Sequence, residues 1–246
     1  MRLSLRYSGV MTTILLTGSS RGIGAAAKAS LEARGAKVIG QATSSKAVDT
    51  VPADFCEPGA PHELWEAALA RTGGEIDVLI NNAGLFDPNP LDRSDIEWLD
   101  AWEDTMRINL TASAQLSRFA VKHWQERGFP GRIVHVASRA GHRGDSPAHW
   151  HYAASKGGML AMHKTIARQY AQQGILSFAI TPGFTDTAMA GDYLESRGGA
   201  GLLADIPLGR VAEPEEMARI ITFCALDAPA SMTGATLDAN GASYVR

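Results

Sequence analysis

The stretch "TILLTGSSRGIGAAAKASLEARG", residues 13–35, decides the fold of this chain. A short apolar run comes first, Gly18, Gly22 and Gly24 follow, and an alanine-rich helical pattern completes it. Glycines at such positions allow a tight turn, close approach of a phosphate to the backbone, and close packing of a helix against a strand. A helix N-terminus also presents unpaired N–H groups to an anion. We therefore predict a strand–turn–helix unit that binds the pyrophosphate of a dinucleotide.

The rest of the chain repeats this alternation of strands and helices. Strand-like runs lie at 13–18, 36–40, 76–82, 132–138, 175–181 and 235–239, with a weaker edge candidate at 50–54. Helical patterns lie at about 22–34, 61–72, 98–124, 150–173 and 213–226. Because the strand centres are apolar at consecutive positions, both faces of the sheet should be covered. We predict an α/β fold, a doubly wound Rossmann-type sandwich with a mainly parallel seven-stranded sheet. One domain should span residues 11–246, with residues 1–10 as a flexible extension.

Composition excludes several classes of function. The chain has 246 residues, 45% of them hydrophobic, and a net charge of -3, so a nucleic-acid partner has no electrostatic support. No apolar run reaches the roughly 18 residues that a membrane span needs. Cys56 and Cys224 form no disulfide framework, which favours a cytoplasmic setting. We expect no metal site, because the histidines near residue 150 lack acidic or cysteine partners at ligand spacing.

The sequence after the second strand bears on the choice of cofactor. NAD-binding chains carry an acidic residue there that bonds the ribose 2′-OH. Residues 38–48 contain neither Asp nor Glu, so nothing in them would repel a 2′-phosphate. Arg21, Thr43, Ser44 and Lys46 offer donors instead. We favour NADP(H) over NAD(H), which stays open; the alternative is that Arg21 only faces solvent.

Six short motifs occur in a fixed order over residues 12–242. They are "TGSSRGIG" (17–24), "NNAG" (81–84), "INLTA" (108–112), "VASRAG" (136–141), "YAASK" (152–156) and "PGFTDTAM" (182–189). In this order they resemble the short-chain dehydrogenase/reductase family. The resemblance implies a catalytic set of Asn109, Ser138, Tyr152 and Lys156. It implies cofactor contacts from Gly18, Ser20, Arg21, Gly22, Ile23, Gly24, Thr43, Asp54, Asn82, Ala83, Gly84, Tyr152, Lys156, Pro182, Gly183 and Thr187.

The chemistry of these residue types agrees with such a role. Hydride transfer to a carbonyl leaves an oxygen that must receive a proton, and a free phenol with a pKa near 10 is a poor partner at neutral pH. Lys156 lies one helical turn from Tyr152, and its charge should favour the phenolate. Tyr152 would be the general acid in reduction and the general base in oxidation, while Ser138 stabilises the substrate oxygen. By resemblance, Lys156 would also hold the nicotinamide ribose, and Asn109 a water.

The substrate is less well defined by the sequence. The run "ARGAKVIGQATSS" looks most like 3-oxoacyl-acyl-carrier-protein reductases, but Phe129 and Gln173 stand where those enzymes carry basic residues. We therefore favour a small ketone, or a secondary alcohol in reverse, over a carrier-bound substrate. A non-catalytic cofactor sensor is the third possibility, although it should have a broken catalytic set. The resemblance also implies a homo-tetramer or homo-dimer formed through helices 98–124 and 150–173.

Three segments border the expected pocket. His142, His149, Trp150 and His151 crowd the stretch between Ser138 and Tyr152, and we favour packing over substrate contact for them. Residues 184–210 should form a mobile lid, and residues 85–95 a second loop at the pocket edge.

Overall fold

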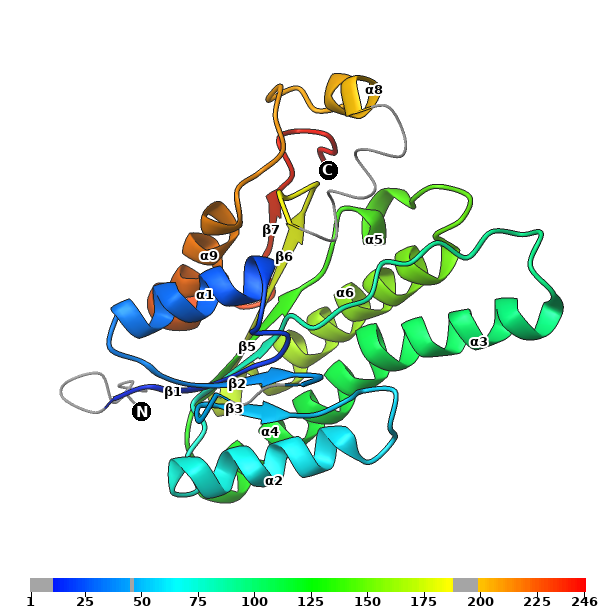
Figure 1. The fold of residues 1–246 in the computed structure, drawn as a ribbon. Coiled ribbons are helices and arrows are strands. Elements are labelled where there is room, and N and C mark those ends of the chain that lie inside the picture. Colours follow the sequence, from blue (N-terminus) through cyan, green and yellow to red (C-terminus); the bar gives the residue numbers. More distant parts are fainter. Residues whose placement is uncertain (1–10, 45–46, 188–198) are drawn as a thin grey trace.

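The computed structural model describes residues 11–44, 47–187 and 199–246. Its centre is one seven-stranded sheet of order β3-β2-β1-β4-β5-β6-β7, in which every pairing is parallel (Figure 1). The strands are β1 (Thr13–Leu16), β2 (Lys37–Ala42), β3 (Thr50–Pro52), β4 (Val78–Asn81), β5 (Gly131–Val136), β6 (Ile175–Pro182) and β7 (Thr236–Ala239). The predicted Rossmann-type fold is confirmed. The weak candidate at 50–54 is the edge strand β3.

The order of the strands fixes the position of a ligand site. β1 pairs with β2 on one side and with β4 on the other, so the chain changes direction across the sheet between them. In open parallel sheets, ligands bind beyond the carboxyl ends of the strands at this point. The glycine-rich turn follows β1 there.

Helices cover both faces of the sheet, as consecutive apolar residues in the strands require. Ile14 and Leu16 of β1 face α1 (Gly22–Ala33) and α9 (Pro214–Thr222), whereas Leu15 faces α2 (Ala60–Thr72), α4 (Ala112–Arg127) and α6 (Trp150–Tyr170). Figure 1 shows α1 and α9 together on one side of the sheet. This double cover keeps the strand ends aligned.

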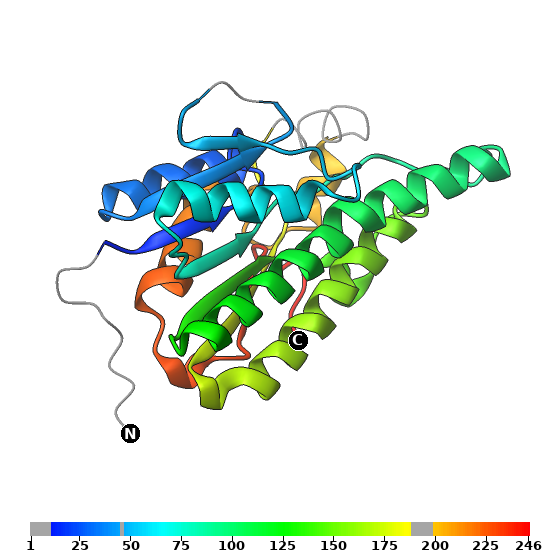
Figure 2. The same cartoon turned by 90° about the horizontal axis from the view of Figure 1, so that it is seen from below.

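The predicted helix at 98–124 is longer than expected and is interrupted. α3 (Asp95–Met106) passes into a π-helical turn, η1 (Arg107–Thr111), and then into α4. Ser94 and Glu97 form a capping box that begins α3. In Figure 2, α3 extends away from the sheet while α4 lies against it. The π turn was not predicted, because its residues are compatible with an ordinary α-helix.

Two short helices were also missed. α5 (Ala140–Arg143) begins shortly after β5 and Ser138, and α8 (Gly199–Ala204) lies within the segment expected to form a lid. Residues 188–198 of that segment lie outside the described residues, as does the predicted extension 1–10. Among the helices in the described ranges, none is long and apolar enough to cross a membrane.

Candidate active site

A cavity of about 900 Å³ follows the carboxyl ends of the strands, at the upper end of the usual size for ligand sites. It runs from the end of β2 past the glycine-rich turn to the end of β6. Of the predicted site residues it is lined by Gly18, Ser20, Arg21, Gly22, Ile23, Gly24, Thr43, Asp54, Asn82, Ala83, Gly84, Ser138, Tyr152, Lys156, Pro182, Gly183 and Thr187. Asn109 lies behind this lining. The structure thus brings together residues that are far apart in the sequence.

The glycine turn is shaped by contacts that only glycine permits. Gly18 and Gly22 have positive φ angles, +64° and +52°. A Cβ on Gly24 would lie 1.9 Å from the carbonyl oxygen of Gly18, so the turn folds back on itself at this point. All three glycines line the cavity, with no side chain of their own between the backbone and the cavity. The turn therefore fits the phosphates of a dinucleotide cofactor.

The "NNAG" segment after β4 holds the other side of the turn. Asn82 Nδ2 donates to the carbonyl oxygens of Thr17 and Gly18, at 2.9 and 3.0 Å. Thr17 Oγ1 in turn accepts hydrogen bonds from the backbone N–H groups of Asn82 and Ala83, both at 2.9 Å. Four hydrogen bonds thus join the carboxyl ends of β1 and β4.

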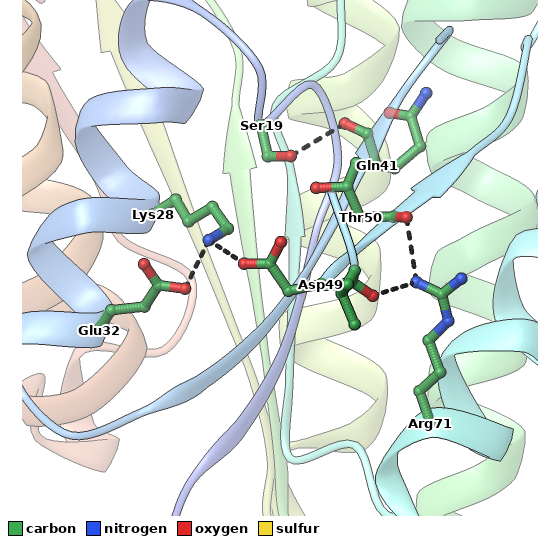
Figure 3. A network of polar contacts seen from close by, with 8 residues as sticks. Ser19, Lys28, Glu32, Gln41, Asp49, Thr50 and Arg71 are labelled. Carbon is green, nitrogen blue, oxygen red and sulfur yellow. Dashed lines mark hydrogen bonds and ion pairs between the residues drawn. The ribbon is translucent and has the colours of Figure 1, made fainter. Parts of the chain in front are cut away.

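Gln41, at the end of β2, is a residue to which the sequence analysis gave no role. Its Oε1 accepts a 2.8 Å hydrogen bond from the N–H of Gly18, and its Nε2 donates to the Ala53 carbonyl at 2.7 Å. The Gln41 carbonyl accepts from both the N–H and the Oγ of Ser19 (Figure 3). This buried carboxamide connects the turn with β2 and with the segment after β3. Its signal in the sequence was a lone amide in an otherwise apolar strand.

Charged side chains beside β2 and β3 pair with one another or with backbone carbonyls (Figure 3). Lys28 on α1 pairs with Asp49 and with Glu32, and its hydrogen bond lowers the pKa of Asp49. Arg71 donates to the carbonyls of Val48 and Thr50, both at 3.0 Å. The negative charge of the Asp49 carboxylate is therefore balanced by Lys28, and Asp49 does not line the cavity.

The exposed residues Arg21, Thr43 and Ser44 line this end of the cavity. Lys46, the fourth predicted donor, lies outside the described residues.

Ser138, Tyr152 and Lys156 meet at the other end of the cavity. Ser138 follows β5, and its side chain hydrogen-bonds Tyr152, which lies in the first turn of α6. Lys156 Nζ donates to the Val136 carbonyl at 2.9 Å and lies 5.7 Å from the centroid of the Tyr152 ring. The spacing of four residues places both side chains toward β5. A hydroxyl, a phenol and an amine thus share one polar corner.

Electrostatics in this corner differ from the expectation. Burial raises the pKa of Tyr152 to about 12, although the hydrogen bond from Ser138 acts in the opposite direction. Burial also lowers the pKa of Lys156 to about 8. In the protein alone the pKa of Tyr152 is therefore raised and not lowered, because desolvation of the phenolate outweighs the hydrogen bond from Ser138. At neutral pH, Tyr152 is a protonated phenol that can donate.

Asn109 lies in the π turn η1 and is fully buried. Its Oδ1 accepts from the Leu85 N–H at 2.7 Å, and its Nδ2 donates to the Leu85 carbonyl at 3.0 Å and to Ser155 Oγ at 3.1 Å. A Cβ on Gly84 would lie 3.4 Å from Asn109 Oδ1 and 3.5 Å from Lys156 Nζ. Asn109 therefore holds the loop that follows β4 close to Lys156.

Comparisons with known proteins agree with this geometry. A family model described as enoyl-(acyl carrier protein) reductase matches residues 18–241. The 3-oxoacyl-(acyl-carrier-protein) reductases of Haemophilus influenzae and Escherichia coli are each 35% identical to this chain, covering 94% of it and 97% and 96% of the relatives. An acetoacetyl-CoA reductase of Rhizobium meliloti is 34% identical over 94% of this chain and 97% of the relative. The chain belongs to the short-chain dehydrogenase/reductase family. It is an oxidoreductase.

At the substrate end of this dehydrogenase/reductase, Leu85, Phe86 and Phe184 line the cavity, and they belong to the two segments expected at the pocket edge. Arg139 and Asp145 also line it, although the sequence gave them no role. The Arg139 guanidinium lies over the Phe184 ring, 4.8 Å from its centroid. They come from three loops, and only the folded arrangement of those loops brings them together.

The described lining of the cavity does not include His142, His149, Trp150 or His151. Within the described ranges, no three His, Cys, Asp or Glu side chains are grouped to hold a metal ion.

Proposed function

We propose that this chain is an NADP(H)-dependent reductase of small ketones, which in reverse oxidises secondary alcohols. The observation that carries the proposal is the corner formed by Ser138, Tyr152 and Lys156 at one end of a dinucleotide-sized cavity. A phenol with a pKa of about 12 and an adjacent hydroxyl suit protonation of an oxygen that is gaining charge.

Each residue has a defined part in the proposed reaction. The bound nicotinamide supplies the hydride in reduction and accepts it in oxidation. Ser138 Oγ hydrogen-bonds the substrate carbonyl oxygen, and Tyr152 Oη transfers its proton to that oxygen. The Lys156 ammonium stabilises the phenolate left on Tyr152 and binds the nicotinamide ribose. Asn109 holds the loop after β4 close to Lys156, where the Tyr152 phenolate regains its proton.

The preference for NADP(H) rests on the end of β2. Gln41 directs its carboxamide oxygen to the Gly18 N–H, and Arg21, Thr43 and Ser44 line the adjacent cavity. A guanidinium with two hydroxyls suits a 2′-phosphate. The turn accepts the phosphates common to both cofactors, so NAD(H) binding should persist but be weaker.

The cofactor preference is tested with Arg21→Ala. We expect kcat/KM to favour NADPH over NADH in the unmodified protein, and the variant to lose about tenfold of that preference, the value of a charge-assisted hydrogen bond. Arg34→Ala is the matched control, since that arginine pairs with Asp227 on the surface. A preference for NADH in the unmodified protein contradicts the proposal.

A 3-oxoacyl-(acyl-carrier-protein) reductase is the second candidate, favoured by the two relatives of that name. Phe129 and Gln173 occupy the positions where the sequence analysis expected basic residues in such enzymes. The Gln173 side chain accepts a hydrogen bond from Gln125, and the Arg127 guanidinium lies 5.3 Å from the centre of the Phe129 ring. Arg127 itself pairs with Glu75. This surface therefore offers an acidic carrier little unpaired positive charge.

One experiment separates the two candidates. NADPH oxidation is followed with free ketones, with coenzyme A thioesters of 3-oxo acids, and with the same acids on the acyl carrier protein. Higher kcat/KM for free ketones supports the first proposal, and a large excess for the carrier thioester supports the second. No turnover with any class, together with intact NADPH binding, would favour a cofactor-binding sensor.

We also propose a homo-dimer or homo-tetramer assembled through the predicted helices 98–124 and 150–173, which correspond to α3–η1–α4 and to α6. Sedimentation velocity measures the assembly state directly, and a monomer at micromolar concentration contradicts the proposal.

A further inference from the structure

The segment His149–His151 lies immediately before Tyr152, and its three aromatic side chains differ sharply in exposure. His149 and His151 are 1% and 2% exposed, whereas Trp150 between them is 53% exposed. Buried histidines are costly unless they make specific contacts. The two rings should therefore make specific contacts on the buried side of α6.

The His149 ring is stacked on Phe86. Their centroids are 4.1 Å apart with an interplanar angle of 14°, and Ser146 Oγ lies 2.7 Å from His149 Nδ1. Phe86 meets the Tyr152 ring edge to face, at 4.6 Å and 73°. Aromatic pairs at such distances attract each other beyond the effect of the area that they bury. The Phe86 ring thus connects His149 with the catalytic phenol.

Further contacts join the same two segments. The backbone of Asp87 hydrogen-bonds the His151 ring, although burial lowers the pKa of His151 overall. The Asn89 N–H donates to the Ala148 carbonyl at 2.8 Å. Residues 86–89 are thus attached to residues 148–152 at three successive points, and we call this paired structure the pocket wall.

The pocket wall is also anchored from its other end. Both backbone groups of Leu85, the residue before Phe86, are bonded to the Asn109 side chain. Asn109, the loop after β4 and the first turn of α6 therefore form a continuous support. Tyr152 is the only one of its aromatic residues that the proposed mechanism uses as a proton donor.

We propose that His149 and His151 are positioning residues that fix the Tyr152 ring through the pocket wall and take no part in proton transfer. This inference rests on the proposed function, because it assigns the support of its general acid. The stacked His149 ring acts as a flat aromatic surface, with Nδ1 directed to Ser146. A phenylalanine should therefore replace it, and an alanine should not.

The test compares His149→Ala, His149→Phe and His151→Ala with Trp150→Ala. The tryptophan variant is the matched control, since it removes an exposed ring from the same helical turn. We expect His149→Ala to lower kcat about 30-fold, because small displacements of catalytic groups are costly. His151→Ala should lower kcat less, His149→Phe should restore it to within about threefold, and Trp150→Ala should leave it unchanged. NADPH affinity, measured by cofactor fluorescence, should stay the same in all four.

A readout independent of turnover keeps the inference separate from the proposed reaction. The protein is labelled with 3-fluorotyrosine, and Tyr152→Phe assigns one ¹⁹F resonance among the five tyrosines. That resonance should move in His149→Ala and stay in place in Trp150→Ala. If the unmodified protein reduces no ketone, the proposed function fails, and the resonance still decides the inference.

Two results would overturn the inference. One is a His149→Ala variant with unchanged kcat and an unchanged Tyr152 resonance, because the stack would then position nothing. The other is a His149→Phe variant as inactive as His149→Ala, with the Tyr152 resonance in its native position. That outcome would make His149 a proton-transfer group.

Discussion

The two ends of the cavity are built in different ways. At the cofactor end, short polar contacts between strand termini hold the glycine turn, and Asn82, Thr17 and Gln41 supply them from three neighbouring strands. At the substrate end, aromatic rings on loops form the wall, with Phe86 stacked on His149. The first end depends on the sheet, which changes little among proteins with one fold. The second depends on loops, which set specificity.

The largest effect is expected from a substitution that removes the proton donor and leaves cofactor binding intact. Tyr152→Phe removes the proton donor and keeps the ring that Phe86 contacts, so kcat should fall about 10³-fold or more. The dissociation constant of NADPH, measured by fluorescence titration, should change less than twofold. A variant with near-normal turnover would remove Tyr152 from the mechanism.

The next largest effect is expected on NADPH affinity, from a substitution in the glycine turn. In Gly24→Ala, the added methyl group collides with the Gly18 carbonyl. Overpacking of about 1–3 kcal/mol should weaken NADPH binding about 30-fold. Gly201→Ala is the control, since in the part of the chain that the structure describes nothing lies within 4 Å of its Cβ position. Equal NADPH affinity in the two variants, both folded by circular dichroism, would show that the turn tolerates the contact.

A pH profile examines Lys156, which lies beside Tyr152 at the substrate end. Its pKa is lowered to about 8, so the ammonium is present below that pH and lost above it. The kcat/KM for reduction should be level from about pH 6 to 7, then fall up to about tenfold per unit well above pH 8. A profile that stays level to pH 9.5 would contradict the charged role of Lys156.

The smallest effect is expected at Gln41, a residue of the cofactor end that the sequence did not single out. Gln41→Met keeps the shape of the side chain but loses both of its hydrogen bonds, which should weaken NADPH binding about tenfold. The kcat at saturating NADPH should change little. Gln173→Met removes a surface glutamine as the control. A fall in kcat with unchanged affinity would place Gln41 in the chemistry instead.

The difference between the two ends also explains what could be predicted. The glycine turn and the Tyr152–Lys156 pair are each encoded within a few consecutive residues, and their place in the order of six motifs predicted that they would share one site. Gln41 acts through the turn and the segment after β3, and that contact exists only once the strands have paired. The loops of Phe86 and Phe184 were expected at the pocket edge, but no local pattern specifies which of their side chains face the cavity. The Tyr152 pKa depends on burial, which the sequence does not show.

The π turn that carries Asn109 has a consequence for how this chain can change. Such a turn holds one more residue than the α-helical turn it replaces, so α3 and α4 are out of phase along one continuous helix. Deleting a single residue from Arg107–Thr111 would restore the α-helical phase. Every side chain of α3 would then rotate by about 100° relative to α4. Whole turns can therefore be lost or gained at the start of α3, which extends away from the sheet. The length of the π turn is fixed, because Asn109 must hydrogen-bond the loop after β4.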